Sequence, residues 1–332
     1  MRPQTRRPSA APRKSAVLLS SALLSAILLA CLPAPAGAET LRVGKAVGVA
    51  FSFVPLDVGI RQGLFAQNGI EIESTTFAGD ARLQQAMAAD GVDIALGSGP
   101  GMAFVAKGSP ITAVAAMAGA PLLLSLIVRP DGPRSVAELK GKTVSVSSAG
   151  SLTYWLVSET SRLQGWGPSG INIATIGAPQ AQYVAMARRD TDGMVADIST
   201  AFDMEQSGKA RILLRFGDLV PDFHIHVIFA TDKAIATRPA TVRAFLKGWF
   251  ASIAFMRQNK DATVAIAMEV LGKDRAIISR SYDELMPMFS DDGKFAAKAL
   301  AVLAHSYVEQ GLLPREPDMS KLYTEAFLPK NE

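Results

Sequence analysis

The chain has 332 residues, of which 49% are hydrophobic and 19% are charged. This composition fits a globular protein with a substantial core and excludes a disordered chain. Five of its 34 basic residues and none of its 30 acidic residues lie within residues 1–38, so the rest of the chain carries 29 basic against 30 acidic residues. This balance excludes the basic surface expected of a nucleic-acid-binding protein or of one drawn to anionic membranes.

Residues 1–38 have the three parts of an export signal. Basic residues come first, an apolar run follows over residues 16–32, and Ala36-Gly37-Ala38 matches a small-x-small cleavage site. The basic residues are Arg2, Arg6, Arg7, Arg13 and Lys14. A membrane anchor is the alternative, but the run is short for one and ends in a cleavage site. We therefore predict cleavage after Ala38 and release into a bacterial periplasm.

Cys31 offers a different processing. Leu28-Leu29-Ala30-Cys31 resembles the lipobox of bacterial lipoproteins, in which the cysteine becomes the lipidated first residue. Cys31 is also the single cysteine of the chain, which excludes an intrachain disulfide and a cysteine nucleophile in the mature protein. A domain of this size does not need disulfides, even in the periplasm.

Hydrophobic periodicity and glycine positions predict alternating strands and helices in the first half of the chain. We expect strands at 41–46, 70–73 and 94–96, and helices at 55–65, 79–88 and 102–105. Residues 111–128 carry no charge over a length that just reaches a membrane span. Because Gly119-Ala120-Pro121 interrupts this stretch, two buried strands joined by a turn are the better interpretation.

The second half continues the alternation and then becomes helical. We expect short helices at 136–142, 152–163, 180–188 and 198–206. We expect strands at 143–146, 171–176, 193–197, 210–214 and 223–229. Four amphipathic helices follow at 239–258, 262–271, 274–286 and 293–310. At roughly 150 residues per domain, the length predicts about two domains.

An internal echo supports two similar α/β lobes. A strand, a small polar loop and a helix follow one another at 43–53 and again at 144–153. A second pairing sets Asp90–Ala95 against Asp192–Asp197. Two lobes that begin in the same way predict two facing crevices, and a cleft between lobes is a favoured place for a small-molecule site.

Several segments, taken in order, resemble a known family. They are Pro55–Glu71, Gly79-Asp80, Ala86–Ala88, Asp93–Ala95 and Glu138–Val144. Together they are similar to the substrate-binding proteins of nitrate/sulfonate/taurine-type ABC importers, over most of the chain and more weakly beyond about residue 235.

The resemblance implies an α/β protein with the type II periplasmic-binding-protein fold, two Rossmann-like lobes joined by two hinge strands. The hinge strands would be 123–129 and 226–231, with lobe 1 at 39–126 and 228–332 and lobe 2 at 127–227. It further implies a monomer without a cofactor that delivers a small solute to an ABC permease and its ATPase.

Enzymes and sensory receptors remain alternatives. Pyrimidine-forming enzymes of the same fold rely on a cysteine-rich motif that this chain lacks, and export argues against the enzymes of menaquinone synthesis that share the fold. A receptor that reports to a signalling protein would differ from a transport protein only in its partner.

Ten residues are the candidate ligand contacts: Phe51, Phe53, Pro55, Gly97, Ser98, Ser148, Gly150, Ser151, Thr153 and Asp197. The loop 148–153 runs into a helix, and its N–H groups, hydroxyls and helix dipole suit a carboxylate or sulfonate. Simple helix capping is the alternative there, and also for Asp197, which could otherwise accept from an amine. The phenylalanines could stack on a solute or belong to the core, as could Tyr154 and Trp155.

Other side-chain chemistry gives weaker signals. His224 and His226 would share one face of a strand, but no nearby residues complete a metal site, so we expect none. The loops contain no arginine clamp for an anion. The sequence therefore predicts capture of a small organic solute, with an anionic group as the first expectation, and leaves its identity open.

Overall fold

Two five-stranded sheets organise the part of the chain that the computed structural model describes, which is residues 38–48, 50–77, 79–147, 149 and 151–330. Residues 1–37 of the predicted export signal, with Cys31, lie outside these residues, as do Ser148 and Gly150. Residues 39–332 make up a single compact unit. Within the described ranges, no helix is long and apolar enough to cross a membrane.

The first sheet has the strand order β2-β1-β3-β10-β4. Its strands are β1 (Glu39–Lys45), β2 (Ile70–Thr76), β3 (Ile94–Ser98), β4 (Ile111–Ala118) and β10 (His226–Thr231). β1 pairs in parallel with β2 and β3, whereas β10 is antiparallel to both β3 and β4. The strand that arrives last in the sequence is therefore inserted, reversed, into a parallel sheet.

The second sheet repeats this plan with the order β7-β6-β8-β5-β9. Its strands are β5 (Leu124–Val128), β6 (Thr143–Val146), β7 (Asn172–Thr175), β8 (Gly193–Asp197) and β9 (Arg211–Arg215). β6 is parallel to β7 and β8, and β5 is antiparallel to β8 and β9. In this sheet the antiparallel strand is β5, which comes first in the sequence.

The chain passes between the sheets through residues 119–123 and 216–225, which lie between β4 and β5 and between β9 and β10. The predicted hinge strands are therefore misplaced, because β5 and β10 each lie wholly within one sheet. The predicted lobe boundaries fall inside these two strands, and a division into separate domains stays a prediction. The two strands expected within 111–128 are present, but they belong to different sheets and do not pair.

The similarity between the two halves of the chain is present, but the residues correspond with a different offset from the one expected from the sequence. Asp93 donates its backbone N–H to the carbonyl of Arg42 and accepts the Arg42 N–H on its carboxylate, at 2.9 and 3.0 Å. Asp192 makes the same two bonds with Thr143, at 2.7 and 2.9 Å. Asp192 therefore corresponds to Asp93 and not to Asp90, so the pairing expected from the sequence is out of register.

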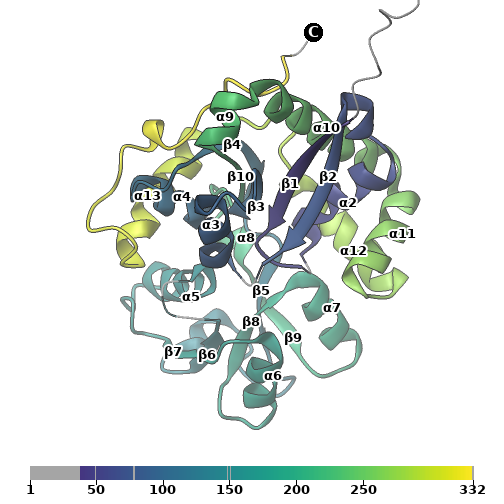
Figure 1. The fold of residues 1–332 in the computed structure, drawn as a ribbon. Helices are drawn as coiled ribbons and strands as arrows, with labels where there is room; N and C mark the ends of the chain where they lie inside the picture. The colour runs from purple at the N-terminus through teal and green to yellow at the C-terminus, as the bar shows by residue number, and fades with distance from the viewer. Residues whose placement is uncertain (1–37, 49, 78, 148, 150, 331–332) are drawn as a thin grey trace, which may run out of the picture. The chain divides into compact units, whose positions relative to one another are not determined.

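Helices cover the sheets, and the helical prediction for the second half of the chain holds closely. Figure 1 shows α2 and α10–α12 on one side of the first sheet, with α3, α4 and α13 on the other. The helices are α2 (Val54–Arg61), α3 (Asp80–Ala88), α4 (Met102–Ala106), α5 (Leu152–Leu163), α6 (Pro179–Ala187), α7 (Ile198–Gln206), α8 (Phe216–Leu219), α9 (Asp232–Thr237), α10 (Pro239–Gln258), α11 (Lys260–Leu271), α12 (Arg275–Leu285) and α13 (Ala297–Glu309). Single 3-10 turns occupy 51–53, 66–68, 99–101, 136–139, 286–288 and 319–321.

Several elements end or begin elsewhere than the sequence predicts. The helix expected at 293–310 begins only at Ala297, the strand expected at 70–73 runs to Thr76, and the helix expected at 136–142 is a 3-10 turn at 136–139. The helix expected at 55–65 stops at Arg61, because Gly63 turns into the left-handed region at φ 67° and Leu64 N–H closes the end on the Gly59 carbonyl at 2.8 Å. The strand expected at 223–229 begins only at His226. Residues before it belong to the passage between sheets, where Ile225 N–H bonds the Gly119 carbonyl at 2.9 Å.

Helices α2 and α10 approach closely around one aromatic ring. A Cβ on Gly59 or on Gly248 would come within 2.4 and 2.5 Å of the Phe65 ring. Phe65 in turn stacks on Phe245 of α10 at 5.4 Å between centroids. The two glycines therefore make room for a ring that fixes the distance between these helices.

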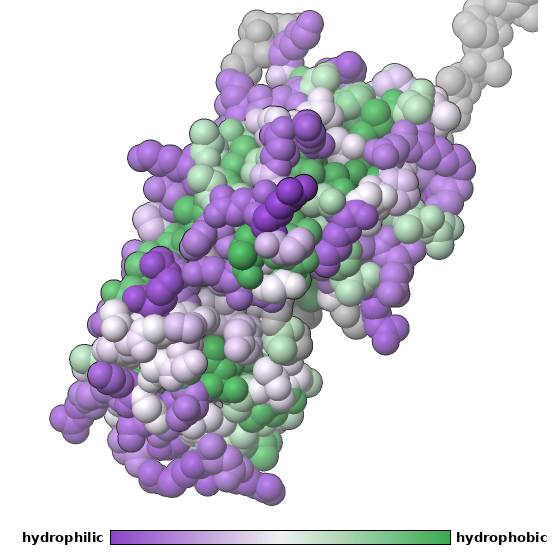
Figure 2. All heavy atoms as spheres, turned by 90° about the vertical axis from the view of Figure 1, so that its left-hand side faces the viewer, coloured by the Kyte–Doolittle hydropathy of each residue, from purple (hydrophilic) through white to green (hydrophobic). Residues whose placement is uncertain are grey.

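The outer surface carries few large hydrophobic side chains. In Figure 2, hydrophilic residues cover most of the face turned to the viewer, and hydrophobic residues form smaller groups between them. The large hydrophobic residues that are exposed among the described ones are Val47, Ile60, Leu163, Val184 and Val308. They are scattered through the sequence and do not mark a broad apolar surface.

Candidate functional site

A cavity of about 610 Å³ lies where loops from both sheets meet. It is lined by Val47, Gly79, Asp80, Ala81, Ser98, Pro100, Gly101, Phe104, Leu124, Ser147, Ser151, Leu152, Thr153 and Leu312. The segments at and after the ends of β2, β3 and β6 contribute most of them. This is the crevice at the carboxyl ends of strands where open α/β sheets bind ligands.

The first wall is built from the end of β3 and the start of α3. Ser98 donates its N–H to the carboxylate Oδ1 of Asp80 at 2.8 Å, and its own hydroxyl accepts the Gly101 N–H at 3.3 Å. Asp80 is the first residue of α3, a position that favours an acidic side chain because it lies at the positive end of the helix dipole. The carboxyl group of Asp80 therefore lies beside the turn 98–101 at the edge of the cavity.

The loop after β3 is held from behind. Gly99 donates to the Ile225 carbonyl at 2.9 Å, and its own carbonyl accepts the Tyr307 hydroxyl at 3.0 Å. A Cβ at this position would come within 1.8 Å of the His224 carbonyl oxygen. Only glycine allows this approach, so the first wall is fixed to the passage between the sheets and to α13.

The second wall is the start of α5. Ser151 caps this helix, because its hydroxyl accepts the Tyr154 N–H at 3.2 Å. Thr153 Oγ1 lies 2.9 Å from the Ser151 hydroxyl and 3.0 Å from the Ser147 hydroxyl, and it accepts the Ser147 N–H at 3.3 Å. The capping interpretation of this loop is correct, and its three hydroxyl side chains also line the cavity.

The described lining of the cavity contains an acidic residue and no basic residue. Asp80 is the ionisable residue among the described residues that line the cavity, and none of these is basic. Burial raises the pKa of the Asp80 carboxyl group, although the bonds from Ser98 act in the opposite direction. The cavity therefore offers one acid, several hydroxyls and apolar walls.

Three of the predicted contacts lie in the core and away from the lining of this cavity. Phe51 and Phe53 are each 1% exposed, and Phe53 packs edge-on against His226 at 5.0 Å. Pro55 is buried in the first turn of α2. The structure thus places these side chains among core residues, and a contact with a solute stays a prediction for them.

The other predicted contacts divide between lining and neighbouring positions. Ser98, Ser151 and Thr153 line the cavity. Gly97 is buried in β3, where a Cβ would come within 3.0 Å of both Asp80 Oδ1 and the Phe229 ring. Asp197 caps α7 by accepting the Ser199 N–H at 2.9 Å, and burial raises its pKa.

The two histidines do not share a strand face. His224 precedes β10, accepts the Ala296 N–H on Nε2 at 3.0 Å and packs against Phe295 at 5.4 Å, whereas His226 packs against Phe53. Burial lowers the pKa of His224 to about 4 and that of His226 to about 3. No group of three or more His, Cys, Asp or Glu residues in the described ranges is placed to hold a metal ion.

Tyr154 and Trp155 follow the second wall into the protein. Tyr154 packs against the core, and Trp155 is 2% exposed and stacks on Phe223 at 5.2 Å with a 13° angle between the ring planes. The indole Nε1 donates to Glu309 of α13 at 2.9 Å. This bond joins a helix of the second sheet to a helix beside the first.

Sequence reasoning missed Asp80 as a lining residue, along with Phe104, Leu124 and Leu312. The sequence pattern identifies Gly79-Asp80 only as a helix start. The acidic residue at the first position of this helix was a signal that could have been used, because Asp80 accepts the N–H of Ser98 at the Gly-Ser end of β3. The apolar residues gave none, because the same pattern serves in any core.

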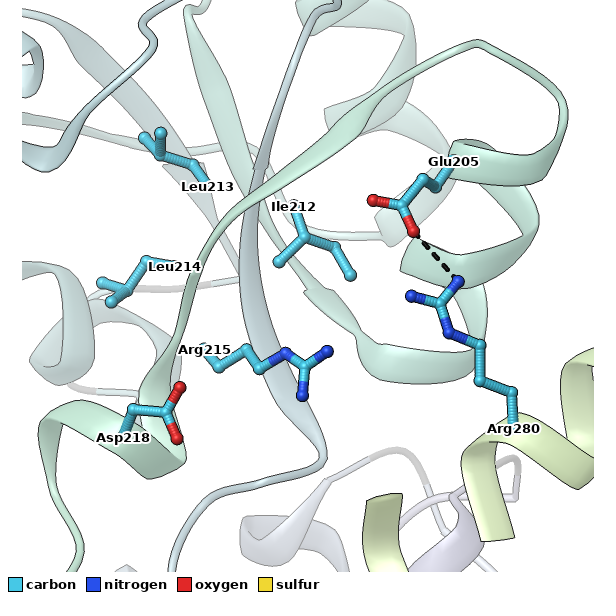
Figure 3. Close-up of a pocket in the computed structure, with 7 residues that line it drawn as sticks. All are labelled: Glu205, Ile212, Leu213, Leu214, Arg215, Asp218 and Arg280. Atoms are coloured by element: carbon cyan, nitrogen blue, oxygen red, sulfur yellow. Dashed lines mark hydrogen bonds and ion pairs between the residues drawn. The ribbon is translucent and has the colours of Figure 1, made fainter. Parts of the chain in front are cut away.

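A second, shallower cavity of about 390 Å³ lies beside β9 (Figure 3). It is lined by Glu205, Ile212, Leu213, Leu214, Arg215, Asp218 and Arg280. Arg280 of α12 pairs with Glu205 of α7 at 2.9 Å, and Arg215 of β9 pairs with Glu284 of α12 at 2.5 Å. Both arginines are therefore engaged in joining α12 to the second sheet.

The two sheets with their reversed strands define the class: an α/β protein with the type II periplasmic-binding-protein fold. The periplasmic aliphatic sulphonate binding protein SsuA from Escherichia coli matches with a TM-score of 0.76 at 17% identity, over 89% of this chain and 94% of that one. The alkanesulfonate-binding protein SsuA from Xanthomonas axonopodis pv. citri, bound to MOPS, matches at 0.72 and 17% identity, over 86% and 98%. An enzyme has the same fold: the desulfurization enzyme DSZB, as a mutant in complex with biphenyl-2-sulfinic acid, matches at 0.66 and 15% identity, over 87% and 97%.

The family follows from the sequence itself. The model of the family described as "NMT1/THI5 like" matches residues 50–263, which is more than half of the chain, and the protein belongs to this family. No curated protein sequence matches the chain significantly.

Proposed function

We propose that the protein is the solute-binding component of an ABC importer, which captures a small organic solute in the cavity of about 610 Å³ and delivers it to a membrane permease. One observation carries the proposal: loops from both sheets line this cavity, with Ser98 and Asp80 on one side and Ser151 and Thr153 on the other. A solute that contacts both walls favours the arrangement in which they face each other, and a permease can recognise that arrangement.

The fold and the family support this function. The two SsuA proteins with the same fold are sulfonate-binding proteins by name. In this chain, the N-terminus of α5 with the hydroxyls of Ser147, Ser151 and Thr153 is the place suited to an acidic group. Micromolar affinity, about −8 kcal/mol, is adequate for such a carrier.

Thermal unfolding of the purified protein with a library of small acids, amines and heterocycles tests the proposal. A solute at one hundred times its Kd stabilises the folded protein by about 2.7 kcal/mol. We expect such a solute to raise Tm by roughly 5 °C or more. The absence of stabilisation by every class of small solute would contradict the function.

A double variant tests the second wall. Ser151→Ala with Thr153→Ala should weaken binding of the solute found in the screen by about tenfold, because two lining hydroxyls are lost. Ser320→Ala with Thr324→Ala is the matched control, since it removes two hydroxyls outside the cavity lining. Equal affinities of the two double variants would remove the second wall from the site.

Export belongs to the same proposal. A periplasmic protein processed after Ala38 begins with Glu39, whereas lipoprotein processing leaves an acylated Cys31. The mass of the mature protein from a bacterial host distinguishes the two, and retention of residues 1–38 would contradict both.

An enzyme is the second candidate, because the fold also occurs in DSZB, a desulfurization enzyme. Mass spectrometry of the solute after prolonged incubation separates the two functions. Quantitative recovery of unchanged solute supports a carrier, and a product formed by the purified protein supports an enzyme.

A further inference from the structure

One helix beside the first sheet is bonded to both walls of the cavity. Near the end of α13, the Tyr307 hydroxyl donates to the Gly99 carbonyl of the first wall at 3.0 Å. Two residues later, the Glu309 carboxylate accepts the indole N–H of Trp155, in the helix that forms the second wall, at 2.9 Å. Leu312, just beyond α13, lines the cavity itself. The last turn of α13 is therefore the place where the separation of the two walls is set.

Glu309 has a second link to α5. The Nε atom of Arg162 lies 3.7 Å from its Oε1 atom, and Glu159 holds the same guanidinium group at 2.6 Å. His305, one turn earlier in α13, lies 3.3 Å from the same Oε1 atom. The Glu309 side chain is only 28% exposed, so water screens these contacts in part. A single carboxylate thus joins α13 to two residues of α5.

A different group of elements joins the sheets through more residues. In Figure 1, α7 and α12 lie on the right, whereas α5 and α13 lie on the left. Three ion pairs connect α7 and β9 to α12 and the residues just before it: Lys273–Asp203 at 3.2 Å, Arg280–Glu205 at 2.9 Å and Arg215–Glu284 at 2.5 Å. No residue takes part in two of them, so the loss of one pair leaves the other two. The loss of Glu309, in contrast, removes both links to α5 described above.

We propose that Glu309 is a positioning residue, which holds the second wall against the first although it is not among the described residues that line the cavity. When its bonds to α5 are broken, α5 moves away from α13 while α7 and α12 stay joined, so the walls separate on one side only. The inference concerns the cavity of the proposed function and rests on that function. Its readouts need no solute, so a failed solute screen and a failed inference remain distinguishable.

Pairs of spin labels on the solute-free protein test the one-sided separation. The chain from Glu39 onward contains no cysteine, so labels attach only at introduced cysteines. Leu163→Cys with Val308→Cys places labels at exposed positions of α5 and α13. Gln206→Cys with Ala276→Cys does the same for α7 and α12. Electron paramagnetic resonance then measures the distance within each pair.

Glu309→Ala should lengthen the α5–α13 distance by about 5 Å or more, beyond the roughly 1–2 Å of ordinary helix shifts at an interface, and leave the α7–α12 distance unchanged. Glu205→Ala is the matched control, because it breaks an ion pair with an arginine but leaves two other pairs in place. We expect neither distance to change in the control. An unchanged α5–α13 distance in Glu309→Ala, or an equal lengthening in the control, would overturn the inference.

Conservative variants separate positioning from folding. Glu309→Gln can still accept the indole N–H but carries no charge for Arg162, so it should lengthen the α5–α13 distance less than Glu309→Ala does. Trp155→Phe keeps a ring against Phe223 and removes the indole donor. It therefore tests the same separation even if Glu309→Ala fails to fold, and an unchanged distance in it would contradict the role of the indole bond.

Hydrogen exchange connects this contact to the cavity. In Glu309→Ala, the amides of residues 154–157 in the first part of α5 should exchange about tenfold faster, because opening of the second wall exposes them. The amides of the loop 98–101, which is held at Gly99, should keep their rates. Equal acceleration in both segments would indicate general destabilisation and would contradict a positioning role for Glu309.

Discussion

The two sheets follow the same plan but are secured differently. In each sheet, an antiparallel strand, β10 or β5, fills the fourth position. In each, an aspartate also accepts a backbone N–H of the second strand in the order, β1 or β6. Asp93 of the first sheet also lies 2.7 Å from Arg42 and 3.3 Å from Arg238. Asp192 of the second sheet has only Arg129, at 3.9 Å, among the ion pairs of the described residues.

The difference extends to the walls of the cavity. The loop after β3 is fixed from behind at Gly99 by Ile225 and Tyr307, whereas the bonds of Thr153 described above remain within its own loop. A repeated topology therefore does not imply equal rigidity. The first wall is fixed at its loop, whereas the second wall is tied to α13 only beyond its loop, through the bond between Trp155 of α5 and Glu309.

The largest expected effect comes from the paired aspartates. Asp93→Asn removes a carboxylate that is 7% exposed and leaves Arg42 and Arg238 with only their exposed partners, Asp90 and Glu39, so we expect a loss of about 3 kcal/mol in the free energy of unfolding. Asp192→Asn should cost about 1 kcal/mol, because the amide oxygen still accepts the Thr143 N–H. Urea unfolding of both variants checks this, and equal losses would break the contrast between the sheets.

Acid should destabilise the folded protein through two buried histidines, His226 of β10 and His224 just before that strand. Burial lowers the pKa of His226 to about 3 and of His224 to about 4, from 6.5. At these two positions the unfolded chain therefore binds protons that the folded protein does not, and the contribution of the two histidines to stability falls as pH falls below 6.5.

At pH 5 the expected loss is about 2 kcal/mol for each histidine. His226→Leu removes one titrating group and should make the loss measured between pH 7.5 and pH 5 by urea unfolding smaller by about 2 kcal/mol. An unchanged slope in this variant would show that His226 does not stay neutral in the folded protein.

The smallest expected effect concerns the two capping serines. Ser151 caps a helix of 12 residues, so Ser151→Ala should cost about 1 kcal/mol. Ser98 caps a 3-10 turn of 3 residues that other bonds hold in place, so we expect only a few tenths of a kcal/mol for Ser98→Ala. Thermal unfolding of the pair at one pH gives the comparison, and the reverse order would mean that the second wall is the fixed one.

Local structure was largely predictable from the sequence. The helix at 239–258 and the strand at 193–197 follow directly from periodicity and from turn residues. The sheet to which a strand belongs could not be predicted in this way. β5 and β10 read as ordinary buried strands, and their exchange between sheets depends on contacts far apart in the sequence.

The site was predictable in part, for a related reason. Ser151 and Thr153 precede a helix and so had a chemical signal of their own. Phe51 and Phe53 had the same apolar pattern whether they face a solute or the core. Asp80 was visible as a helix start, but its orientation toward the cavity depends on how α3 packs against β3.

The bond between Trp155 and Glu309 gives the molecule an intrinsic optical reporter. The indole is buried, stacked on the passage between the sheets and hydrogen-bonded to α13, so it is sensitive to any separation of α5 from that helix. Water entering there would shift tryptophan emission to longer wavelengths. Solute capture would then be followed in the unlabelled protein in real time, against the background emission of Trp166 and of Trp249 in the centre of α10.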